Sequence, residues 1–227
     1  MKLDILYEDN HLIAVNKGNS DLVQGDKTGD EPLSDKVKAY IKKKYNKPGN
    51  VYLGVIHRLD RPVTGIVIFA KTSKALTRMN KIFQEQKAKK IYWAVVKNLP
   101  QDDEAILTHY MRKDGAKNKS YVYDTSRKDR KKAVLEYKIA SSSSNYYLLE
   151  VDLITGRHHQ VRAQLAKIGS PIKGDLKYGF ARSNKNGGIT LHARSLSFTH
   201  PVTTEEIKIV APTPKDEPLW REFKNMI

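Results

Sequence analysis

The chain has 227 residues, a length that suits one domain of ordinary to large size or two small domains that share a sheet. Its 41 lysines and arginines against 25 aspartates and glutamates give a formal net charge of +16, so a polyanion is the first partner to expect. The absence of cysteine excludes disulfides, cysteine-containing zinc sites, iron–sulfur clusters and a cysteine nucleophile. No apolar run reaches the roughly 18 residues that span a bilayer, and the start has no secretory signal, so we expect a cytoplasmic protein with no membrane association.

The first half of the sequence predicts a hairpin, a helix and two buried strands. Residues 5–8 and 12–15 are short β-prone runs on either side of a turn, which predicts a hairpin. Apolar residues at helical spacing predict a helix over residues 33–45, with lysines on its other faces. Residues 51–56 and 66–70 are apolar and β-branched, and they predict two buried strands.

Strand and helix signals continue through the second half. Thr72 or Ser73 can cap a helix whose apolar residues recur at spacings of three and four. Residues 91–96 predict a strand, and the cationic stretch 113–132 predicts a β-hairpin arm or a loop. The alternating runs 134–140 and 146–154 predict a second hairpin.

The fold class follows from the balance of these elements. A helix is predicted over residues 160–168, and late strands over residues 189–198 and 207–210. Strands therefore outnumber helices and most connections are hairpins, which predicts an α+β fold around a mixed, largely antiparallel sheet flanked by a few helices. The sequence shows no internal repeat and no change of composition that would mark an interdomain linker.

The polar segment 57–65 contains the first constellation that can carry chemistry. Asp60 lies between Arg58 and Arg61 directly after a predicted strand, and strand-end loops are where scaffolds present reactive groups. Neighbouring cations favour an ionised carboxylate, which suits a nucleophile or a charge stabiliser better than a proton donor. From the residues alone, a structural Asp–Arg pair remains the alternative.

A second constellation joins a predicted strand to the helix at residues 155–162. The N–H groups of the first helical turn and the nearby arginines would favour a phosphate. Two adjacent histidines suggest a metal, but residues one apart do not face each other on a helix, no acidic residue lies between Asp152 and Asp175, and cysteine is absent, so we expect no metal. His159 and Arg162 share a helical face, so Arg162 can reach a carboxylate on a neighbouring loop while His159 or Arg157 contacts the substrate.

Tyr92 lies in the predicted strand 91–96. A tyrosine in such a strand is either a core residue or a platform on which a base can stack. The sequence lacks the motifs of phosphate-binding loops, dinucleotide-binding folds, serine hydrolases and zinc proteases. The residues alone therefore describe a basic protein with one carboxylate among arginines, and they give no support for nucleotide hydrolysis, dinucleotide redox chemistry or zinc proteolysis.

Three motifs in order closely resemble the RluA-type family of RNA pseudouridine synthases. They are His57-Arg58-Leu59-Asp60-Arg61 with Thr64-Gly65, then Lys90-Ile91-Tyr92-Trp93-Ala94-Val95, then Leu153-Ile154-Thr155-Gly156-Arg157-His158-His159-Gln160-Val161-Arg162. Shorter matches occur at Asn16-Lys17 and at residues 169–175 and 191–193, so the resemblance runs from about residue 5 to residue 212. The sequence departs from the family at Pro62-Val63-Thr64, where relatives more often have a polar residue and then Thr-Ser, and it resembles the short members without an N-terminal S4-type module.

The resemblance implies a pseudouridine synthase fold and the isomerisation of uridines in structured RNA, either rRNA or tRNA, without a metal or other cofactor. Asp60 would be the catalytic carboxylate, and attack on C1′, addition to C6 and abstraction of a 2′ proton all remain open as its route. Arg162 would pair with Asp60, and Arg58 would fill the gap left by the flipped base. Tyr92 would stack under the flipped uracil, and its hydroxyl is a candidate for proton transfer. The residues expected to bind substrate are His57, Arg58, Arg61, Arg157, His159 and Gln160.

The same resemblance implies one catalytic domain over residues 1–227, or two subdomains sharing one sheet, with no separate RNA-binding domain. RNA would then dock on the catalytic domain through the lysine-rich stretches 36–44, 81–90 and 113–132, and we expect a monomer. One alternative is a non-catalytic RNA-binding or ribosome-assembly factor on the same fold. Another is a glycosidase-like hydrolase, which usually needs a second carboxylate that neither motif offers.

Overall fold

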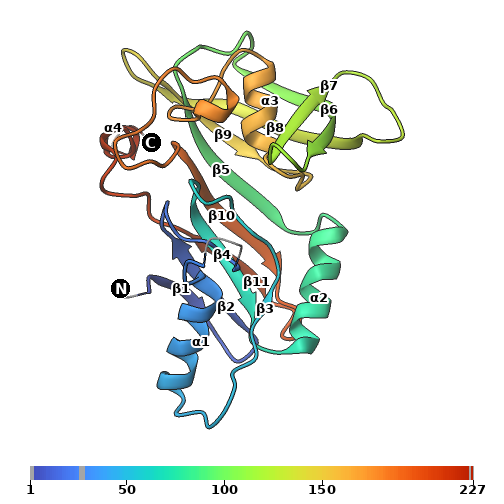
Figure 1. Cartoon of the computed structure of the whole chain (residues 1–227), viewed down its shortest axis with the longest axis vertical. Helices are drawn as coiled ribbons and strands as arrows, with labels where there is room; N and C mark the ends of the chain where they lie inside the picture. The colour runs from blue at the N-terminus through green and yellow to red at the C-terminus, as the bar shows by residue number, and fades with distance from the viewer. Residues whose placement is uncertain (1–2, 26–28, 225, 227) are drawn as a thin grey trace. The chain divides into compact units, whose positions relative to one another are not determined.

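The computed structural model describes residues 3–25, 29–224 and 226 (Figure 1). The chain forms two compact units, of which unit 1 comprises Met1–Ala88 and Arg194–Pro212 and unit 2 comprises Lys89–Ala193 and Thr213–Ile227. Strand β10 (Leu191–Thr199) begins in unit 2 and continues into unit 1. Each unit contains its own buried apolar clusters, and each is described in turn.

Unit 1 is built on an antiparallel arrangement of short strands with two helices. Its elements are β1 (Ile5–Glu8), β2 (Leu12–Lys17), α1 (Leu33–Lys44), β3 (Gly54–Val55), β4 (Thr64–Ala70), α2 (Ser73–Gln84), the second part of β10, and β11 (Glu206–Val210). Strand β2 pairs with both β1 and β4, and β11 pairs with β10. The hairpin predicted at the start of the chain is confirmed, with an irregularity in register between Ile5 and Tyr7.

The two helices of unit 1 pack on opposite faces of β2. Met79 of α2 lies in one apolar cluster with Leu12. The other face carries Ile13, whose direct partner on β1 is Glu8, and the Tyr40 hydroxyl of α1 donates a hydrogen bond to Glu8 at 3.0 Å. Because neighbouring residues of a strand point to opposite faces, β2 is covered on both sides, which explains its continuous apolar sequence.

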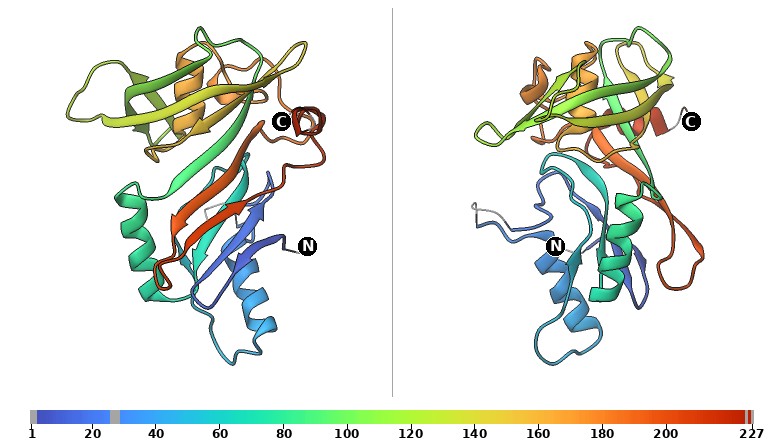
Figure 2. Two further views of the ribbon diagram at one scale, coloured as in Figure 1. Left: turned by 180° about the vertical axis from the view of Figure 1, so that it is seen from behind. Right: turned by 90° about the vertical axis from the view of Figure 1, so that its right-hand side faces the viewer.

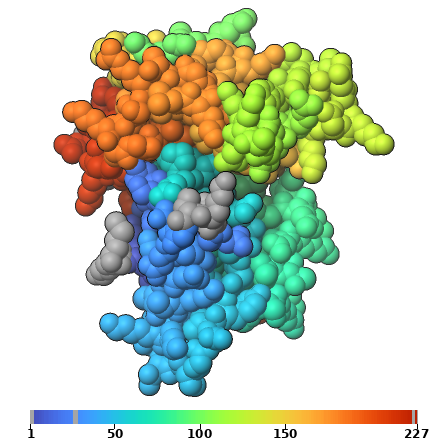
Figure 3. Space-filling model, viewed as in Figure 1, coloured from blue at the N-terminus to red at the C-terminus, as the bar shows by residue number. Residues whose placement is uncertain are grey.

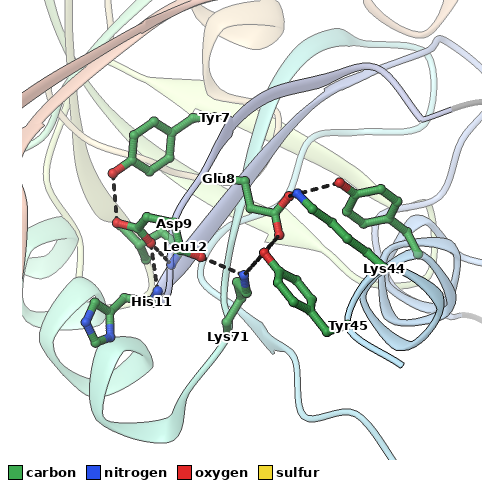
Figure 4. A network of polar contacts seen from close by, with 9 residues as sticks. Tyr7, Glu8, Asp9, His11, Leu12, Lys44, Tyr45 and Lys71 are labelled. Carbon is green, nitrogen blue, oxygen red and sulfur yellow. Dashed lines mark hydrogen bonds and ion pairs between the residues drawn. The ribbon is translucent and has the colours of Figure 1, made fainter. Parts of the chain in front are cut away.

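Glu8 anchors the C-terminal end of α1 (Figure 4). Its Oε2 accepts hydrogen bonds from Tyr40 at 3.0 Å and Lys44 at 2.7 Å, and its Oε1 accepts from Tyr45 at 2.8 Å and Lys71 at 3.0 Å. Burial raises the pKa of Glu8, but the hydrogen bonds from these four residues outweigh burial and lower the pKa to about 2. The ionised carboxylate therefore joins β1, α1 and the residue that follows β4.

The helices of unit 1 agree with their sequence signals, whereas one predicted strand is wrong in extent. Thr72 caps α2 as expected, because its Oγ1 accepts a hydrogen bond from the N–H of Ala75 at 3.2 Å. Of the strand predicted over residues 51–56, only Gly54 and Val55 pair with β4. β4 also has β10 as a neighbour, so only part of β4 is available to pair with residues 51–56.

Unit 2 is an antiparallel sheet with strand order β5-β9-β8-β6-β7 (Figure 2). Its elements are β5 (Lys89–Val96), β6 (Glu104–Asp114), β7 (Lys119–Tyr123), β8 (Lys131–Ser142), β9 (Tyr147–Asp152), α3 (Gln160–Lys167), the 3₁₀ helix η1 (Leu176–Tyr178), the first part of β10, and α4 (Pro218–Lys224). The cationic stretch 113–132 forms a hairpin arm with the turn between β6 and β7, and the hairpin of β8 and β9 is confirmed. Sequence patterns did not predict α4.

The helices of unit 2 cover different faces of this sheet. Ala163 of α3 packs in one cluster with Ala133 of β8, while Trp220 of α4 packs with Trp93 and Val95 of β5. The predicted fold class, α+β around a largely antiparallel sheet with a few helices, is confirmed. Within the described ranges, no helix is long and apolar enough to cross a membrane.

Candidate active site

Asp60 lies on the connection from β3 to β4 in unit 1. The N–H of Val63 donates a hydrogen bond to the carbonyl oxygen of Asp60 at 3.0 Å, which closes a turn just before β4. Leu59 and Val63 are buried on either side of that turn, whereas Asp60 itself is partly exposed. Two apolar anchors therefore hold the loop while the carboxylate remains accessible.

His57 holds the start of the same loop against β4 and α2. Its Nε2 accepts a hydrogen bond from the N–H of Ile68 at 3.2 Å, and its ring lies 5.3 Å from the ring of Phe83, centroid to centroid. These contacts give His57 a local structural role. Its predicted contact with substrate remains a prediction.

Arg58 and Arg61 flank the carboxylate and are both exposed. The Nη2 of Arg61 lies 2.7 Å from the Oδ2 of Asp30, which is also exposed. An exposed ion pair of this kind contributes only about 0–1 kcal/mol to stability. A phosphate group could therefore displace Asp30 from Arg61 at small cost.

Lys17 lies behind the Asp60 loop and was not among the predicted site residues. It is the last residue of β2 and is only 1% exposed. Its Nζ donates hydrogen bonds to the carbonyl oxygens of Gly18 at 2.7 Å, Arg61 at 2.9 Å and Val63 at 2.7 Å. Three carbonyl acceptors match the three N–H donors of an ammonium group, so one side chain ties β2 to the loop.

Burial lowers the pKa of Lys17 to about 7, while the charges of Asp21 and Asp60 act in the opposite direction. Lys17 thus places a titratable positive charge beside the candidate catalytic carboxylate. The signal for its burial was present in the sequence, because Lys17 alternates in β2 with Ile13 and Val15, which point inward.

In unit 2, Tyr92 of β5 lies on the sheet face that α3 covers. Tyr92 is the direct partner of Val151, and Val151 is the direct partner of Tyr137. Tyr137 shares a face with Ala133, four residues earlier in β8, and Ala133 packs against α3. Since directly paired residues point to the same side, Tyr92 points to the α3 side, and it is only 8% exposed.

Gln160 organises the turn that precedes α3. Its Oε1 accepts hydrogen bonds from the Thr155 hydroxyl at 2.8 Å and from the N–H of Arg157 at 2.9 Å, and its Nε2 donates to the carbonyl of Val134 at 3.0 Å. Arg157 is exposed, and its Nε donates to the carbonyl of Lys132 at 2.9 Å. Gln160 therefore shapes the loop on which Arg157 lies, and substrate contacts of both residues remain predictions.

His159 is buried and precedes α3 in the left-handed backbone region, with φ 55°. Its Nδ1 lies 2.9 Å from the hydroxyl of Tyr178, and its ring stacks on that of His158 at 3.8 Å between centroids. Burial, reinforced by the charge of Arg162, lowers the pKa of His159 to about 2. His159 is thus a neutral hydrogen-bonding group near neutral pH rather than a cation for phosphate.

Arg162 forms a buried bidentate ion pair with Asp175. Its Nε lies 2.6 Å from Oδ2 and its Nη2 lies 2.9 Å from Oδ1, and the two residues are 5% and 1% exposed. The guanidinium carbon also lies 5.2 Å from the ring centre of Tyr178. Asp175 and Tyr178 therefore fix the orientation of Arg162, and its predicted pairing with Asp60 remains a prediction.

Each unit thus gathers part of the predicted site. Unit 1 presents Asp60 with Arg58, Arg61 and His57 on one loop, and unit 2 places Tyr92 and the α3 residue Arg162 on the same side of its sheet. Among the described residues, no cluster of three or more histidine, aspartate or glutamate side chains could hold a metal ion. The chemistry available to this set is that of an accessible carboxylate, guanidinium groups and a phenol.

Comparisons with known proteins identify the family. Residues 11–167 match the family model described as RNA pseudouridylate synthase, and the chain belongs to this family. The ribosomal large subunit pseudouridine synthase D of Xylella fastidiosa is 31% identical over 227 residues, covering 94% of this chain and 67% of the relative. The tRNA pseudouridine synthase C of Haemophilus ducreyi is 31% identical over 227 residues, covering 93% of this chain and 91% of the relative.

The chain spans 66% of the length of some other curated relatives. A solved structure of the human protein called RNA pseudouridylate synthase domain containing 4 superposes with a TM-score of 0.78 and is 24% identical, covering 93% of this chain and 89% of that one. At that identity the likeness shows the fold, and the fold is the one that the sequence motifs implied.

Proposed function

We propose that this protein converts specific uridines of structured RNA to pseudouridine, with Asp60 as the catalytic carboxylate. The observation that carries the proposal is the loop of unit 1, where a partly exposed Asp60 is flanked by two exposed arginines and backed by Lys17. Membership of the RNA pseudouridylate synthase family gives this carboxylate a reaction.

The reaction is an isomerisation, so its atoms balance without a co-reactant. The N1–C1′ bond of uridine breaks, the base turns, C5 bonds to C1′, and the proton lost from C5 is matched by one gained at N1. A carboxylate can serve by attack on C1′, by addition to C6 or by removal of a 2′ proton, and all three routes need it ionised. The target base has to leave its stack, which favours a pocket that can hold one flipped uracil.

The remaining residues have supporting roles in the proposal. Tyr92 would stack against the flipped uracil, and Arg162, oriented by Asp175, would pair with Asp60. Arg58 would occupy the gap that the base leaves. Arg61 and Arg157 would contact phosphates, while His57, His159 and Gln160 would shape the binding surface through the loop contacts that each makes.

The RNA substrate is proposed only by class. One relative is named for ribosomal RNA of the large subunit and another for tRNA, so rRNA and tRNA are the two candidates. Both occur in the cytoplasm, where we place the reaction. Comparing pseudouridines in total RNA with and without this gene would identify the uridine, and light scattering of the purified protein would test the expected monomer.

An Asp60→Asn variant tests the central claim. It keeps the size of the side chain and removes the charge, so we expect a folded protein with nearly unchanged RNA affinity and no pseudouridine in a mass-spectrometric assay. Asp30→Asn is the matched control, because Asp30 is an exposed acid that pairs with Arg61. Turnover by the Asp60→Asn protein would contradict the assignment, and rescue of a deletion strain by that variant would instead favour a non-catalytic RNA-binding role.

A further inference from the structure

The sheet of unit 2 has a second face, away from α3. Met111 of β6, Val122 of β7 and Ala133 of β8 point toward α3 and form a common cluster with it. Side chains alternate along strands, so their neighbours in sequence point to the other side. In Figure 3, β7 and the loop after it lie at the surface of unit 2.

Tyrosines and basic residues lie side by side on this second face. Tyr110 of β6 is the direct partner of Tyr123 on β7 and of Lys132 on β8. Two residues further along β6, Arg112 is the direct partner of Tyr121. Directly paired side chains in an antiparallel sheet lie about 4.5–5.5 Å apart at Cβ, so these residues form a continuous surface over three strands.

The contacts within this surface already show its chemistry. The guanidinium carbon of Arg130 lies 3.6 Å from the ring centre of Tyr123, and that of Arg112 lies 6.0 Å from it. Arg112 and Lys132 are exposed, and the three tyrosines are half-exposed. The surface comprises Tyr110, Arg112, Tyr121, Tyr123, Arg130 and Lys132, and we call it the tyrosine–arginine face.

We propose that the tyrosine–arginine face binds a single-stranded segment of the RNA substrate, stacking unpaired bases on its tyrosines and arginines and pairing its cations with phosphates. Partly exposed aromatic rings interleaved with cations on a sheet suit unpaired bases, whose ring faces are accessible, better than a duplex, whose bases are stacked inside. The net charge of +16 is complementary to a phosphate backbone. The identity of the RNA as a substrate rests on the proposed function.

This face is separate from the candidate catalytic residues of unit 2. Tyr92 points to the α3 side, and Arg162 belongs to α3 itself, so both are on the opposite side of the sheet from Tyr110 and Tyr121. A substitution of Tyr121 therefore does not touch either residue directly. The surface would extend recognition beyond the target uridine to nucleotides elsewhere in the substrate.

The test measures the affinity of the full-length protein for a fluorescein-labelled single-stranded RNA, with the same RNA annealed as a duplex for comparison. Tyr121→Ala and Tyr110→Ala should each weaken single-strand binding by about 10-fold, the effect of losing one stacked base, and change duplex binding by less than about twofold. Tyr121→Phe keeps the ring and should bind like the wild type. Tyr52→Ala, at an exposed tyrosine of unit 1, is the matched control and should change nothing.

A second variant, which removes a charge, keeps the proposal testable if an alanine variant does not fold. Lys132→Gln should reduce the slope of log affinity against log salt by about 0.7, which corresponds to the loss of one phosphate contact on a single strand. The proposal is overturned if folded tyrosine variants bind the single strand like the wild type, or if Lys132→Gln leaves the salt slope unchanged. Either result would favour a protein rather than RNA as the ligand of the tyrosine–arginine face.

The outcome can be separated from that of the proposed function. If the wild type makes no pseudouridine in any RNA but Tyr121→Ala still loses single-strand affinity, the enzymatic proposal fails and the binding face stands. If pseudouridine forms and the tyrosine variants bind single-stranded RNA like the wild type, the enzymatic proposal stands and the proposed binding face fails. Asp60→Asn should retain the single-strand affinity of the wild type in both cases.

Discussion

Arg162 and Asp175 form a buried pair in which both carboxylate oxygens face the guanidinium group. The arginine lies on α3 and the aspartate immediately precedes η1, so the pair joins two elements on one side of unit 2. Two parallel hydrogen bonds fix the plane of the guanidinium as well as its position. The direction in which Arg162 can act is therefore set by Asp175.

Replacing Asp175 with asparagine should destabilise the protein and misorient Arg162. Leaving a buried charge without its partner costs about 3–5 kcal/mol, and the free energy of unfolding in urea measures it. Turnover should fall by more than RNA affinity does, since Arg162 is proposed to act on the reacting site. Asp129→Asn removes an exposed partner of Arg112 and should cost at most about 1 kcal/mol. Equal losses of unfolding free energy in the two variants would show that the burial of the Arg162–Asp175 pair does not add to its effect on stability.

Lys17 predicts a rise of stability with pH. Its folded-state pKa is lowered to about 7, while in the unfolded chain it keeps the ordinary value of 10.5. Between these values the unfolded state binds more protons, so the free energy of unfolding increases from pH 7 toward about pH 10. Lys17→Met should remove this contribution, giving a flatter profile than the wild type in urea titrations at a series of pH values. Parallel profiles would show that Lys17 does not titrate in this range.

The same variant should affect the Asp60 loop. Methionine keeps most of the length of the side chain but cannot donate to the carbonyls of Arg61 and Val63, which Lys17 now joins to β2. We expect turnover to fall about tenfold or more while RNA affinity changes little, because small displacements of a catalytic group are costly. Lys138→Met, at an exposed lysine of β8 that pairs with Glu150 and lies outside the lysine-rich stretches, is the matched control.

Glu8 predicts a pH dependence of the same sign at the acid end, because there too the unfolded state binds more protons than the folded state. Its pKa in the folded protein is lowered to about 2 from an ordinary 4.5, so its contribution to stability is present above pH 4.5 and is lost as the pH falls toward 2. Glu8→Gln should lower the free energy of unfolding by about 2 kcal/mol at pH 7, as expected for hydrogen bonds to a charged group. The difference from wild type should shrink below pH 4.5, and a constant difference down to pH 2 would contradict the assignment.

The periodicity of apolar residues predicted most strands and helices. It did so because the apolar face of each element packs into a cluster within its own unit. Periodicity failed where a contact between distant residues decides the structure. The short strand β3 depends on how much of β4 remains available for pairing. Helix α4 follows a polar, proline-containing segment, and its apolar signal is limited to Leu219, Trp220 and Phe223.

The candidate site shows the same division. The motifs brought Asp60, Tyr92 and Arg162 to attention, and the strand and helix predictions placed them on a loop, a strand and a helix. The roles of the residues that hold them were missed. Lys17 reaches the carbonyl oxygens of Arg61 and Val63, which are far along the chain, and Asp175 lies in an irregular segment. Gln160 was expected to bind substrate, but its position at the start of α3 does not reveal that its amide faces the preceding loop.

Tyr92 allows stacking and proton transfer to be separated. The side chain is 8% exposed and lies on the α3 side of the sheet, so phenylalanine can occupy its place with the ring retained and only the hydroxyl removed. We expect Tyr92→Phe to bind RNA within about twofold of the wild type, because stacking depends on the ring. Turnover should fall by about 10²-fold or more, the usual loss when a group that transfers a proton is removed.

The comparison with Tyr92→Leu completes this test, because leucine removes the aromatic ring and preserves an apolar side chain. If stacking positions the uracil, Tyr92→Leu should lose RNA affinity as well as turnover, whereas Tyr92→Phe loses turnover alone. Single-turnover kinetics at saturating RNA separate the two effects, since they report the chemical step without binding. Wild-type turnover by Tyr92→Phe would assign the whole contribution of Tyr92 to its ring and require the C5 proton to be removed by another group.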